Sequence, residues 1–470
     1  MITSSEQQYI ELYEQARQMI FGHAPEAMNA VRDQAFEDFR KQGFPSKKVE
    51  RYKYTDLQQL FAPDYGVNLN RLEIPVDPYQ AFRCDVPNLS TSLYFVVNDS
   101  FYRGVRSEEC GGRIPNPTPK LPEGVIVGSM QELSSLHLPP STFLEKYYAR
   151  LAKTSEDAVT ALNTMLAQDG LVVYVPKNVK VDRAIQVINI LKATPNNAQR
   201  QVPDLMVNRR VLIVLEEGAE LKMLFCDHAV DDKNFLATQV IEAYVGENAS
   251  LDLYCLEETH YKNVRVSNVY IDQQANSRVN HNVITLHNGT TRNKLDLTFS
   301  GEGAECQCYG CVIADKQQHV DNNTLITHKV PYCTSNELYK YVLDDKATGA
   351  FAGRVLVEHG AQKTVSQMTN QNLTATKEAR MYTQPMLEIY ADDVKCAHGS
   401  TVGQLNDAAL FYMRQRGISL EEAKLLLQNA FINEVIDKMQ LTPLRDRLHH
   451  LVEKRFRGEL NKCEGCKLCK

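Results

Sequence analysis

The chain has no tryptophan among its 470 residues, and it lacks both a surplus of basic residues and long apolar runs. Its 52 lysines and arginines stand against 58 acids, which gives a formal net charge of −6. A protein whose main ligand is nucleic acid needs positive charge to neutralise phosphates, so this balance argues against that class. No apolar stretch approaches the roughly 20 residues of a membrane-spanning helix. We therefore expect neither nucleic acid nor a membrane as a partner.

Motifs of several enzyme classes are also absent. There is no G-x-x-x-x-G-K-[ST] loop, so the chain should not hydrolyse ATP itself, and there is no G-x-S-x-G elbow. The N-terminus, MITSSEQQYIELYEQARQMIF, has charges and glutamines where a secretory signal has an apolar core. We expect a cytoplasmic protein, in which the 12 cysteines are buried residues, metal ligands or reactive thiols rather than a disulfide framework.

The hydrophobic pattern divides the chain into three regions. They are a helical and mixed region over 1–165, a strand-rich core over 166–392 and a second helical region over 393–470. In the first region, apolar residues recur at helical spacing from Tyr9 to Ile20. A second helix is predicted from near Pro25 to about Lys41, because proline is favoured in the first turn of a helix.

The middle region is built from short alternating apolar runs such as LVVYVP, IQVINI and LDLYCLE. A turn residue, a small residue and an alternating strand recur about every 27–30 residues. The pattern appears at Gly218-Ala219, Asn248-Ala249, Asn276-Ser277 and Gly303-Ala304. One such repeat cannot bury its apolar face alone, so repeats stack. We predict a mainly β protein with a right-handed parallel β-helix core between helical ends; an antiparallel sandwich with long loops is the alternative.

The last region has clear helix signals. A helix is predicted from Asn406 to Arg416 with Gly417 as its C-terminal cap, and Ser419 and Glu422 have the spacing of a capping box. Pro443 opens a third helix. The second helix carries an apolar stripe wide enough to bury against another surface. The stripe consists of Ala423, Leu426, Leu427, Ala430, Phe431, Val435 and Ile436.

The segment ADDVKCAHGSTVG, residues 391–403, carries a thiol and an imidazole where the strand pattern changes to helix. In an extended chain Cys396 and His398 project to the same side, so both could reach one metal ion. Thiolate and imidazole suit iron, zinc or copper. Lys395 and a protonated His398 would help to hold Cys396 as a thiolate. Because a stable site usually needs four ligands, others would come from distant parts of the chain or from a partner. The alternative is a buried cysteine beside a surface histidine.

Two further cysteine clusters have less specific spacing. CQCYGC, with Cys306, Cys308 and Cys311, is either a metal site or a row of small buried side chains, and we favour the buried row. Histidines are scattered over the strand region without a close ligand pairing, and we interpret most of them as core or interface residues. They are His281, His287, His319, His328 and His359.

The C-terminal tail, CEGCKLCK, places Cys463, Cys466 and Cys469 at the spacing of a partial iron–sulfur ligand run. A fourth ligand and a following proline are missing. The tail is therefore either an accessory metal site or a disordered end, and the residues do not favour one of these interpretations.

One long run gives the chain a family resemblance. TQPMLEIYADDVKCAHGSTVGQLNDAALFYMRQRGIS, residues 383–419, resembles the signature of the SufB/SufD family of the SUF iron–sulfur cluster assembly system. The resemblance extends through DNNTLITHKVPYCTSNELYKYVL, GRVLVEHGAQKTVSQMTNQNL and ALNTMLAQDGLVVYVPKNV, and is strongest over 321–434. It is weaker in GFPSKKVERYKYTDL, where Tyr52 replaces a usual tryptophan. Gly399 stands where SufB carries an acid, so the chain resembles the SufD branch.

This resemblance implies a scaffold subunit rather than an enzyme, with a β-helix core that pairs with a SufB-like paralogue. It also implies that the ABC-type ATPase SufC binds the C-terminal helices. His398 matches a family histidine implicated as a ligand, and Cys396 matches the neighbouring cysteine. Iron or a transient iron–sulfur cluster would then be shared with the partner, with nothing bound tightly by the isolated chain. The expected ATPase-docking residues are Leu410, Phe411, Arg416, Leu426, Leu427 and Phe431.

Two other functions remain open from the residues. One is a structural scaffold that ligates no metal. The other is a β-helix enzyme acting on carbohydrate, which would use clustered acids; the adjacent Asp392 and Asp393 would point to opposite faces of an extended chain. Because a solenoid end offers unpaired strand edges, we also expect that the isolated chain can pair with itself.

Overall fold

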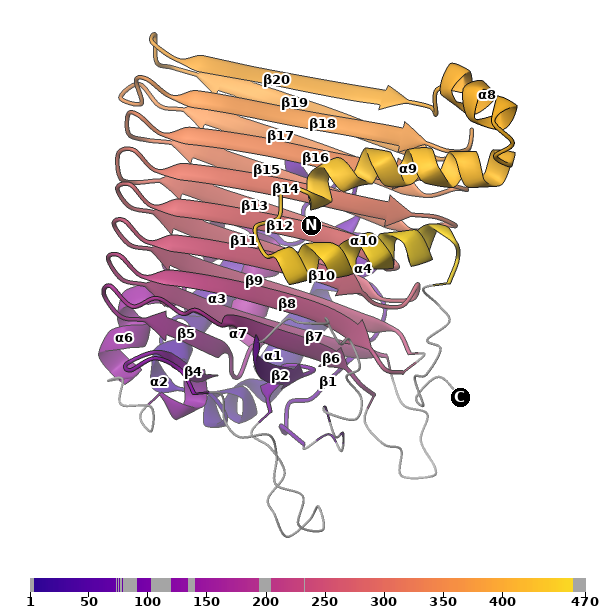
Figure 1. Ribbon diagram of the computed structural model, residues 1–470. Coiled ribbons are helices and arrows are strands. Elements are labelled where there is room, and N and C mark those ends of the chain that lie inside the picture. Colours follow the sequence, from indigo (N-terminus) through magenta and orange to yellow (C-terminus); the bar gives the residue numbers. More distant parts are fainter. Residues whose placement is uncertain are drawn as a thin grey trace, which may run out of the picture.

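The computed structural model describes residues 4–72, 91–102, 120–133, 140–193, 204–231 and 233–459, with positions 74, 76 and 78. Its centre is a β-solenoid of about 7 turns, made of two parallel sheets (Figure 1). Helices from the two ends of the chain cover opposite faces of this core. The prediction of a parallel β-helix core between helical regions is confirmed, and the antiparallel sandwich is wrong. The right hand of the coil stays a prediction.

The two sheets take alternate strands along the chain. Sheet A contains, in spatial order, β4 (Ile126–Ser129), β5 (Leu171–Val175), β7 (Leu205–Leu215), β9 (Phe235–Val245), β11 (Val264–Gln273), β13 (Thr290–Phe299), β15 (His319–His328), β17 (Thr348–Val357) and β19 (Arg380–Ile389), and β1 (Gly66–Val67) also pairs with β7. Sheet B contains β3 (Ser100–Phe101), β2 (Thr91–Val97), β6 (Ala184–Leu191), β8 (Glu220–Ala229), β10 (Ser250–Glu258), β12 (Arg278–His287), β14 (Glu305–Ala314), β16 (Thr334–Leu343), β18 (Val365–Thr374) and β20 (Lys395–Gly403). Each full turn of the core therefore adds one strand to each sheet.

The repeated turn motif has a backbone cause. Gly218, Asn248, Asn276 and Gly303 all have φ between 54° and 72°, a left-handed conformation that glycine and asparagine adopt at the lowest cost. The small residue that follows each of them is fully buried, and a strand of sheet B begins directly after it. This turn fixes the register in which successive strands stack, so the repeat in the sequence is the repeat of the solenoid.

The interior between the sheets is the main core. Leu251, Leu253, Ile271 and Phe299 are among its fully buried apolar residues. Cys306 and Cys308 belong to this core, whereas Cys311 faces outward and is buried beneath the C-terminal helices. The interpretation of CQCYGC as a row of small buried side chains is therefore confirmed.

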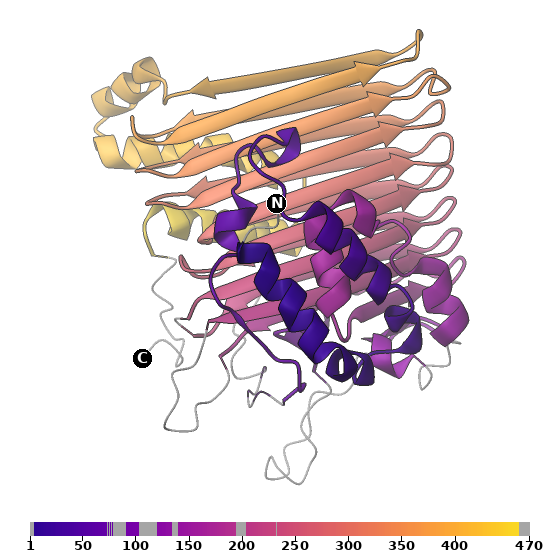
Figure 2. The ribbon, with the colours of Figure 1, turned by 180° about the vertical axis from the view of Figure 1, so that it is seen from behind.

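The N-terminal helices cover the outer face of sheet A (Figure 2). They are α1 (Ser4–Gly22), α2 (Glu26–Asn29), α3 (Arg32–Gln42), α4 (Leu57–Leu60), α6 (Pro140–Tyr147) and α7 (Ala158–Leu166), with short 3₁₀ turns η1 (Glu50–Tyr52), η2 (Met130–Glu132) and η3 (Thr154–Glu156). The single helix predicted from Pro25 to Lys41 is wrong, because the chain forms α2 and α3 there. Asn29 turns back to donate to Phe21 and Ala24, and α3 starts afresh at Arg32.

The C-terminal helices are α8 (Asp407–Gln415), α9 (Leu420–Ile436) and α10 (Thr442–Phe456). Helices α9 and α10 lie across the outer face of sheet B (Figure 1). Gly417 caps α8 with φ 83°, and the Ser419 hydroxyl accepts a bond from the Glu422 N–H, as predicted. The Glu422 carboxylate instead accepts bonds from Arg457 of α10's end, so the capping box is half formed.

The domain boundaries shift slightly. Strand β20 continues the solenoid to Gly403, beyond residue 392 where the sequence placed the end of the core. The C-terminal helical region therefore starts at Asp407. The N-terminal region also donates β1, β2, β3 and β4 to the sheets, so it is continuous with the core. Among the described helices, none has the length and apolar character to span a membrane.

The two ends of the solenoid differ. At one end the last strands are β4, which pairs antiparallel with β5, and the two-residue β3, which pairs antiparallel with β2. At the other end β19 and β20 are the last strands of their sheets, so within the described chain each has a strand neighbour on one side (Figure 1). We call β19 and β20 the open end.

Candidate functional site

Cys396 and His398 lie on β20, at the open end. In the register of sheet B, Cys396 lies beside Ser366 and His398 lies beside Met368 of β18. Ser366 and Met368 are buried, and Met368 belongs to the core between the sheets. Neighbouring side chains in register share a face, so Cys396 and His398 both project toward the uncovered interior of the last turn. The predicted placement of the two donors on one side of an extended segment is confirmed.

The environment of Cys396 is apolar rather than cationic. Its half-buried side chain packs against the interior core, and burial raises the pKa of its thiol. The expectation that Lys395 and His398 hold Cys396 as a thiolate is therefore wrong for the isolated chain. Lys395 is the preceding residue of the strand and points to the opposite face, which explains its failure to lower the thiol pKa.

A hydroxyl pair lies next to these donors. The Thr383 and Ser400 side-chain oxygens are 2.6 Å apart and join β19 to β20 across the open end. Ser400 follows His398 on the same face of β20. The last turn thus presents a thiol, an imidazole and two hydroxyl groups within a short stretch of two edge strands.

The thiol and imidazole form an incomplete metal site. In the part of the chain that the structure describes, no group of three or more His, Cys, Asp or Glu side chains could hold a metal ion. Among the described residues, no distant side chain therefore supplies the missing ligands. A thiolate and an imidazole are still suitable ligands for iron, provided that a second molecule supplies the remaining ligands.

The scattered histidines have packing roles, as interpreted from the sequence. His281 and His328 are buried, and burial lowers their pKa to about 4 and about 3. His287 bonds to the Thr259 carbonyl and His319 to the Thr55 hydroxyl. His359 lies on the turn before β18, where its ring is near that of Tyr390. Cys463, Cys466 and Cys469 lie outside the described residues.

The six predicted docking residues do not form one exposed face. Phe411 and Leu426 are 64% and 41% exposed, and Arg416 is exposed with its guanidinium bonded to the Tyr412 hydroxyl. Leu410 is buried and Leu427 is half-buried. Tyr412, which the sequence did not single out, is 59% exposed beside Phe411.

Phe431 has a different environment from the exposed docking residues. Its ring packs on the outer face of sheet B, and the Lys340 ammonium lies 4.3 Å from the ring centre. The residue therefore fixes α9 to the core. Phe411, Tyr412, Arg416 and Leu426 are exposed on these helices, and we call these four residues the exposed patch.

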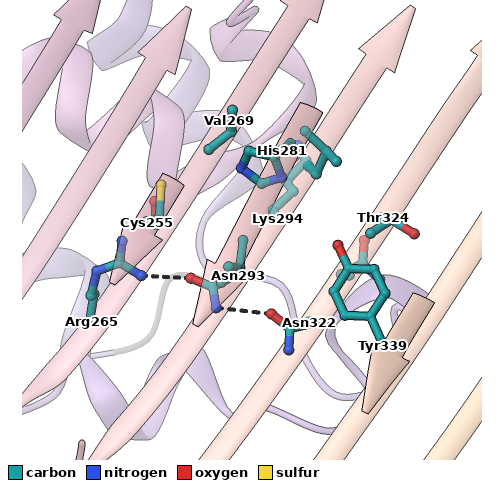
Figure 3. Close-up of a pocket in the computed structure, with 13 residues that line it drawn as sticks. Cys255, Arg265, Val269, His281, Asn293, Lys294, Asn322, Thr324 and Tyr339 are labelled. Carbon is teal, nitrogen blue, oxygen red and sulfur yellow. Dashed lines mark hydrogen bonds between the residues drawn. The ribbon is translucent and has the colours of Figure 1, made fainter. Parts of the chain in front are cut away.

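The interior also holds a small polar cavity of about 10 Å³, room for one water (Figure 3). Arg265 donates to Asn293, and Asn293 donates to Asn322. Neither ring nitrogen of His281 has a hydrogen-bond partner in the described chain. This polar layer could not be recognised from the sequence, because its residues alternate with apolar ones as outward-facing residues would. The cavity is too small for a substrate.

Comparisons with known proteins agree with this architecture. A family model described as "SUF system FeS cluster assembly, SufBD core domain" matches residues 196–431, and one described as "SufBD protein N-terminal region" matches residues 3–187. An iron–sulfur cluster assembly SufBD family protein of Synechocystis is 28% identical, covering 87% of this chain and 86% of that protein.

Two proteins named iron–sulfur cluster assembly protein SufD are also similar. The Bacillus subtilis protein is 24% identical, covering 97% of this chain and 98% of its own length. The Escherichia coli protein is 35% identical over a shorter stretch, covering 36% of this chain and 40% of its own length. With both family models matched along the solenoid and its N-terminal helices, the chain belongs to the SufB/SufD family of the SUF iron–sulfur cluster assembly system.

Proposed function

We propose that the chain is a non-catalytic scaffold subunit of a cytoplasmic iron–sulfur cluster assembly complex, and that its open end pairs with a SufB-like paralogue. The observation that carries the proposal is the incomplete donor pair, Cys396 and His398, on an edge strand. A site with two ligands on an uncovered end needs a second protein to complete it.

The open end is suited to pairing with another β-solenoid. Edge strands present unpaired backbone N–H and C=O groups that a partner strand can bind. Val402 and Ile389 expose 49% and 39% of their surface there. At the opposite end the last strands, β3 and β4, are short and pair antiparallel with their neighbours, so a partner that extends the parallel sheets fits the β19 and β20 end.

Iron or a nascent cluster is the cargo of this site rather than a resident cofactor. Cys396 and His398 would bind it together with ligands from the paralogue. Because burial raises the pKa of the Cys396 thiol, binding must release a proton, and the isolated chain should hold iron weakly. A shared site can also release its cargo when the two subunits move apart.

We place the partner ATPase on the exposed patch of Phe411, Tyr412, Arg416 and Leu426. The chain has no phosphate-binding loop of its own, so ATP hydrolysis would belong to that partner. Helices α9 and α10 are tied to sheet B through Lys340–Glu434 and Arg455–Asp315 ion pairs. Movement of α8 and α9 by the ATPase would therefore pull on the outer face of sheet B, toward β16 and β18, and shift the open end.

Anaerobic purification of the tagged chain from its own cells tests the pairing. We expect a SufB-like paralogue and an ABC-type ATPase in the eluate. Val402→Lys adds a charge to the exposed face of the edge strand and should remove the paralogue while leaving the ATPase bound. Tyr261→Lys, on an exposed turn far along the solenoid, is the matched control. Retention of the paralogue by Val402→Lys would contradict docking at the open end.

The isolated chain should pair with itself through the same edges. Analytical ultracentrifugation is expected to give a dimer for the wild type and a monomer for Val402→Lys. A monomeric wild-type protein would contradict self-pairing without affecting the heteromeric proposal.

A structural scaffold without metal ligation is the second candidate. The half-buried, apolar environment of the Cys396 side chain favours it. The two candidates differ in one respect: the scaffold alone predicts that cluster formation survives loss of the His398 imidazole.

A further inference from the structure

An N-terminal segment crosses the outer face of sheet A and reaches the open end. This segment, Glu50–Thr55, is part of the violet chain that rises above the other N-terminal helices in Figure 2. Arg51 and Thr55 anchor this segment on β13 and β15. Arg51 donates to Asp296 at 2.6 Å and to Asn323 at 2.8 Å, and the Thr55 hydroxyl donates to Asp321 at 2.6 Å.

The anchor is buried and does not depend on surface ion pairs alone. Arg292, buried on β13, donates to the Arg51 carbonyl at 2.6 Å and also pairs with Asp321. The buried Tyr52 ring lies 4.4 Å beneath the Arg292 guanidinium, and its hydroxyl bonds to Asp157. The backbone of the segment is therefore fixed to the middle of the solenoid.

Further contacts of the segment are made with β19, an edge strand. The Tyr54 ring stacks on Tyr382 with centres 4.8 Å apart and planes at 17°. Gln384 donates to the Glu50 carboxylate at 2.8 Å. The Tyr54 hydroxyl also lies 3.4 Å from the Gln384 side-chain oxygen. Tyr382 and Gln384 share the outer face of β19 because they alternate along the strand.

Thr383, between these two residues, points to the opposite face and meets Ser400 of β20 at 2.6 Å. A continuous set of contacts thus runs from Tyr54 through Tyr382 and Thr383 to the strand that carries Cys396 and His398. Edge strands open locally more easily than central ones, since they have fewer partners. A contact that holds β19 from outside would suppress this opening.

We propose that Glu50–Thr55 is a brace for the open end, and that Tyr54 is a positioning residue for Cys396 and His398. The role of that pair rests on the proposed function, but the brace itself does not. It fixes β19, and the Thr383–Ser400 bond transmits this order to β20. Cys396 and His398 are then held in one arrangement before the partner binds, which lowers the entropy cost of completing a shared site.

The test uses the full-length, metal-free chain and two readouts. The first is the rate at which iodoacetamide alkylates Cys396, followed by peptide mass spectrometry. Cys396 is half-buried, whereas the other cysteines of the described chain are buried. The second is hydrogen exchange of the β20 amides. Tyr54→Ala removes the stack and should speed alkylation about fivefold, the factor that corresponds to about 1 kcal/mol for one aromatic pair.

Three variants make the test specific. Tyr54→Phe keeps the stacked ring and should behave as the wild type. Tyr261→Ala removes an exposed tyrosine that also contacts a neighbouring ring, His260, but on the turn between β10 and β11, and should change neither readout. Thr383→Val breaks the hydroxyl pair. It should speed Cys396 alkylation and the hydrogen exchange of the β20 amides as Tyr54→Ala does.

Three results would overturn the brace. They are unchanged β20 exchange in Tyr54→Ala, equal acceleration in Tyr261→Ala, and wild-type behaviour of Thr383→Val. None of these readouts requires metal or a partner, so the brace can hold even where the ligand role of His398 fails. Conversely, a His398→Ala defect in cluster formation with unchanged behaviour of Tyr54→Ala would support the site and reject the brace.

Discussion

Lys340 on β16 forms an ion pair with Glu434 of α9, and its ammonium also lies over the Phe431 ring at 4.3 Å. Lys340 is buried, so these contacts hold α9 against the outer face of sheet B. The apolar residues of α9 thus have two uses: Phe431 packs inward, and Leu426 faces solvent. This division decides how substitutions on the helix should act.

We predict opposite outcomes for Phe411→Asp and Phe431→Ala. Phe411 is 64% exposed, so Phe411→Asp should leave the melting temperature unchanged and weaken ATPase binding about tenfold or more. Phe431→Ala removes a half-buried ring and a cation–π contact, and should lower the free energy of unfolding by about 1–3 kcal/mol. Calorimetry of the two variants, with titration of the ATPase, checks both. Tight ATPase binding by Phe411→Asp would contradict the docking patch.

The buried carboxylic acid of Glu337 predicts a pH-dependent stability. Burial raises its pKa to about 7, above the ordinary value of 4.5. The folded chain therefore holds this proton at a pH where the unfolded chain has lost it. Stability from this group is full below about pH 4.5 and falls as pH rises toward 7. Glu337→Gln should lose this dependence, so its stability relative to the wild type should rise between pH 5 and pH 8 in urea titrations.

Glu302→Gln, on an exposed turn, is the control for this titration. It should run parallel to the wild type across the whole range. A constant stability difference between Glu337→Gln and the wild type from pH 5 to pH 8 would refute the buried, protonated acid.

Asp227 compensates two buried arginines. It accepts from Arg209 at 2.6 Å and from Arg265 at 2.8 Å, with all three side chains nearly inaccessible to solvent. Asp227→Asn removes the negative charge and leaves both guanidinium groups buried without a carboxylate to compensate their charge. We expect a loss of about 3–5 kcal/mol in the free energy of unfolding, measured by urea denaturation.

The matched control for this loss is Asp272→Asn, on a strand of the same solenoid but at a half-buried position. It should cost far less than Asp227→Asn. Equal losses in the two variants would show that the buried cluster of Asp227, Arg209 and Arg265 contributes no more to stability than a half-buried carboxylate does.

The solenoid could be predicted from the sequence because its turns need a left-handed backbone conformation that favours particular residue types. Gly218 and Asn276 occupy left-handed turns, and these residue types recur there. The same turn contains Tyr332 before β16 and Lys363 before β18, with φ of 63° and 60°. These residues carry no turn signal, so the repeat fades from the sequence while it continues in the structure.

The candidate site was accessible to sequence reasoning because Cys396 and His398 are near neighbours in the chain. Their common face follows from strand geometry alone. The brace was not accessible, since Tyr54 and Tyr382 are far apart in the chain and meet only in the folded protein. The thiol pKa was also mispredicted, because burial against the core depends on packing that the charge pattern around Cys396 does not reveal.

The most direct test of the account is cluster formation by the complete complex containing His398→Ala, reconstituted anaerobically with iron and sulfide and followed by visible absorption and iron content. His359→Ala, a histidine on the turn before β18, is the control. We predict that His398→Ala assembles with its partners but forms little cluster, while His359→Ala behaves as the wild type. Full cluster formation by an intact His398→Ala complex would contradict the ligand role and leave the chain as a scaffold alone.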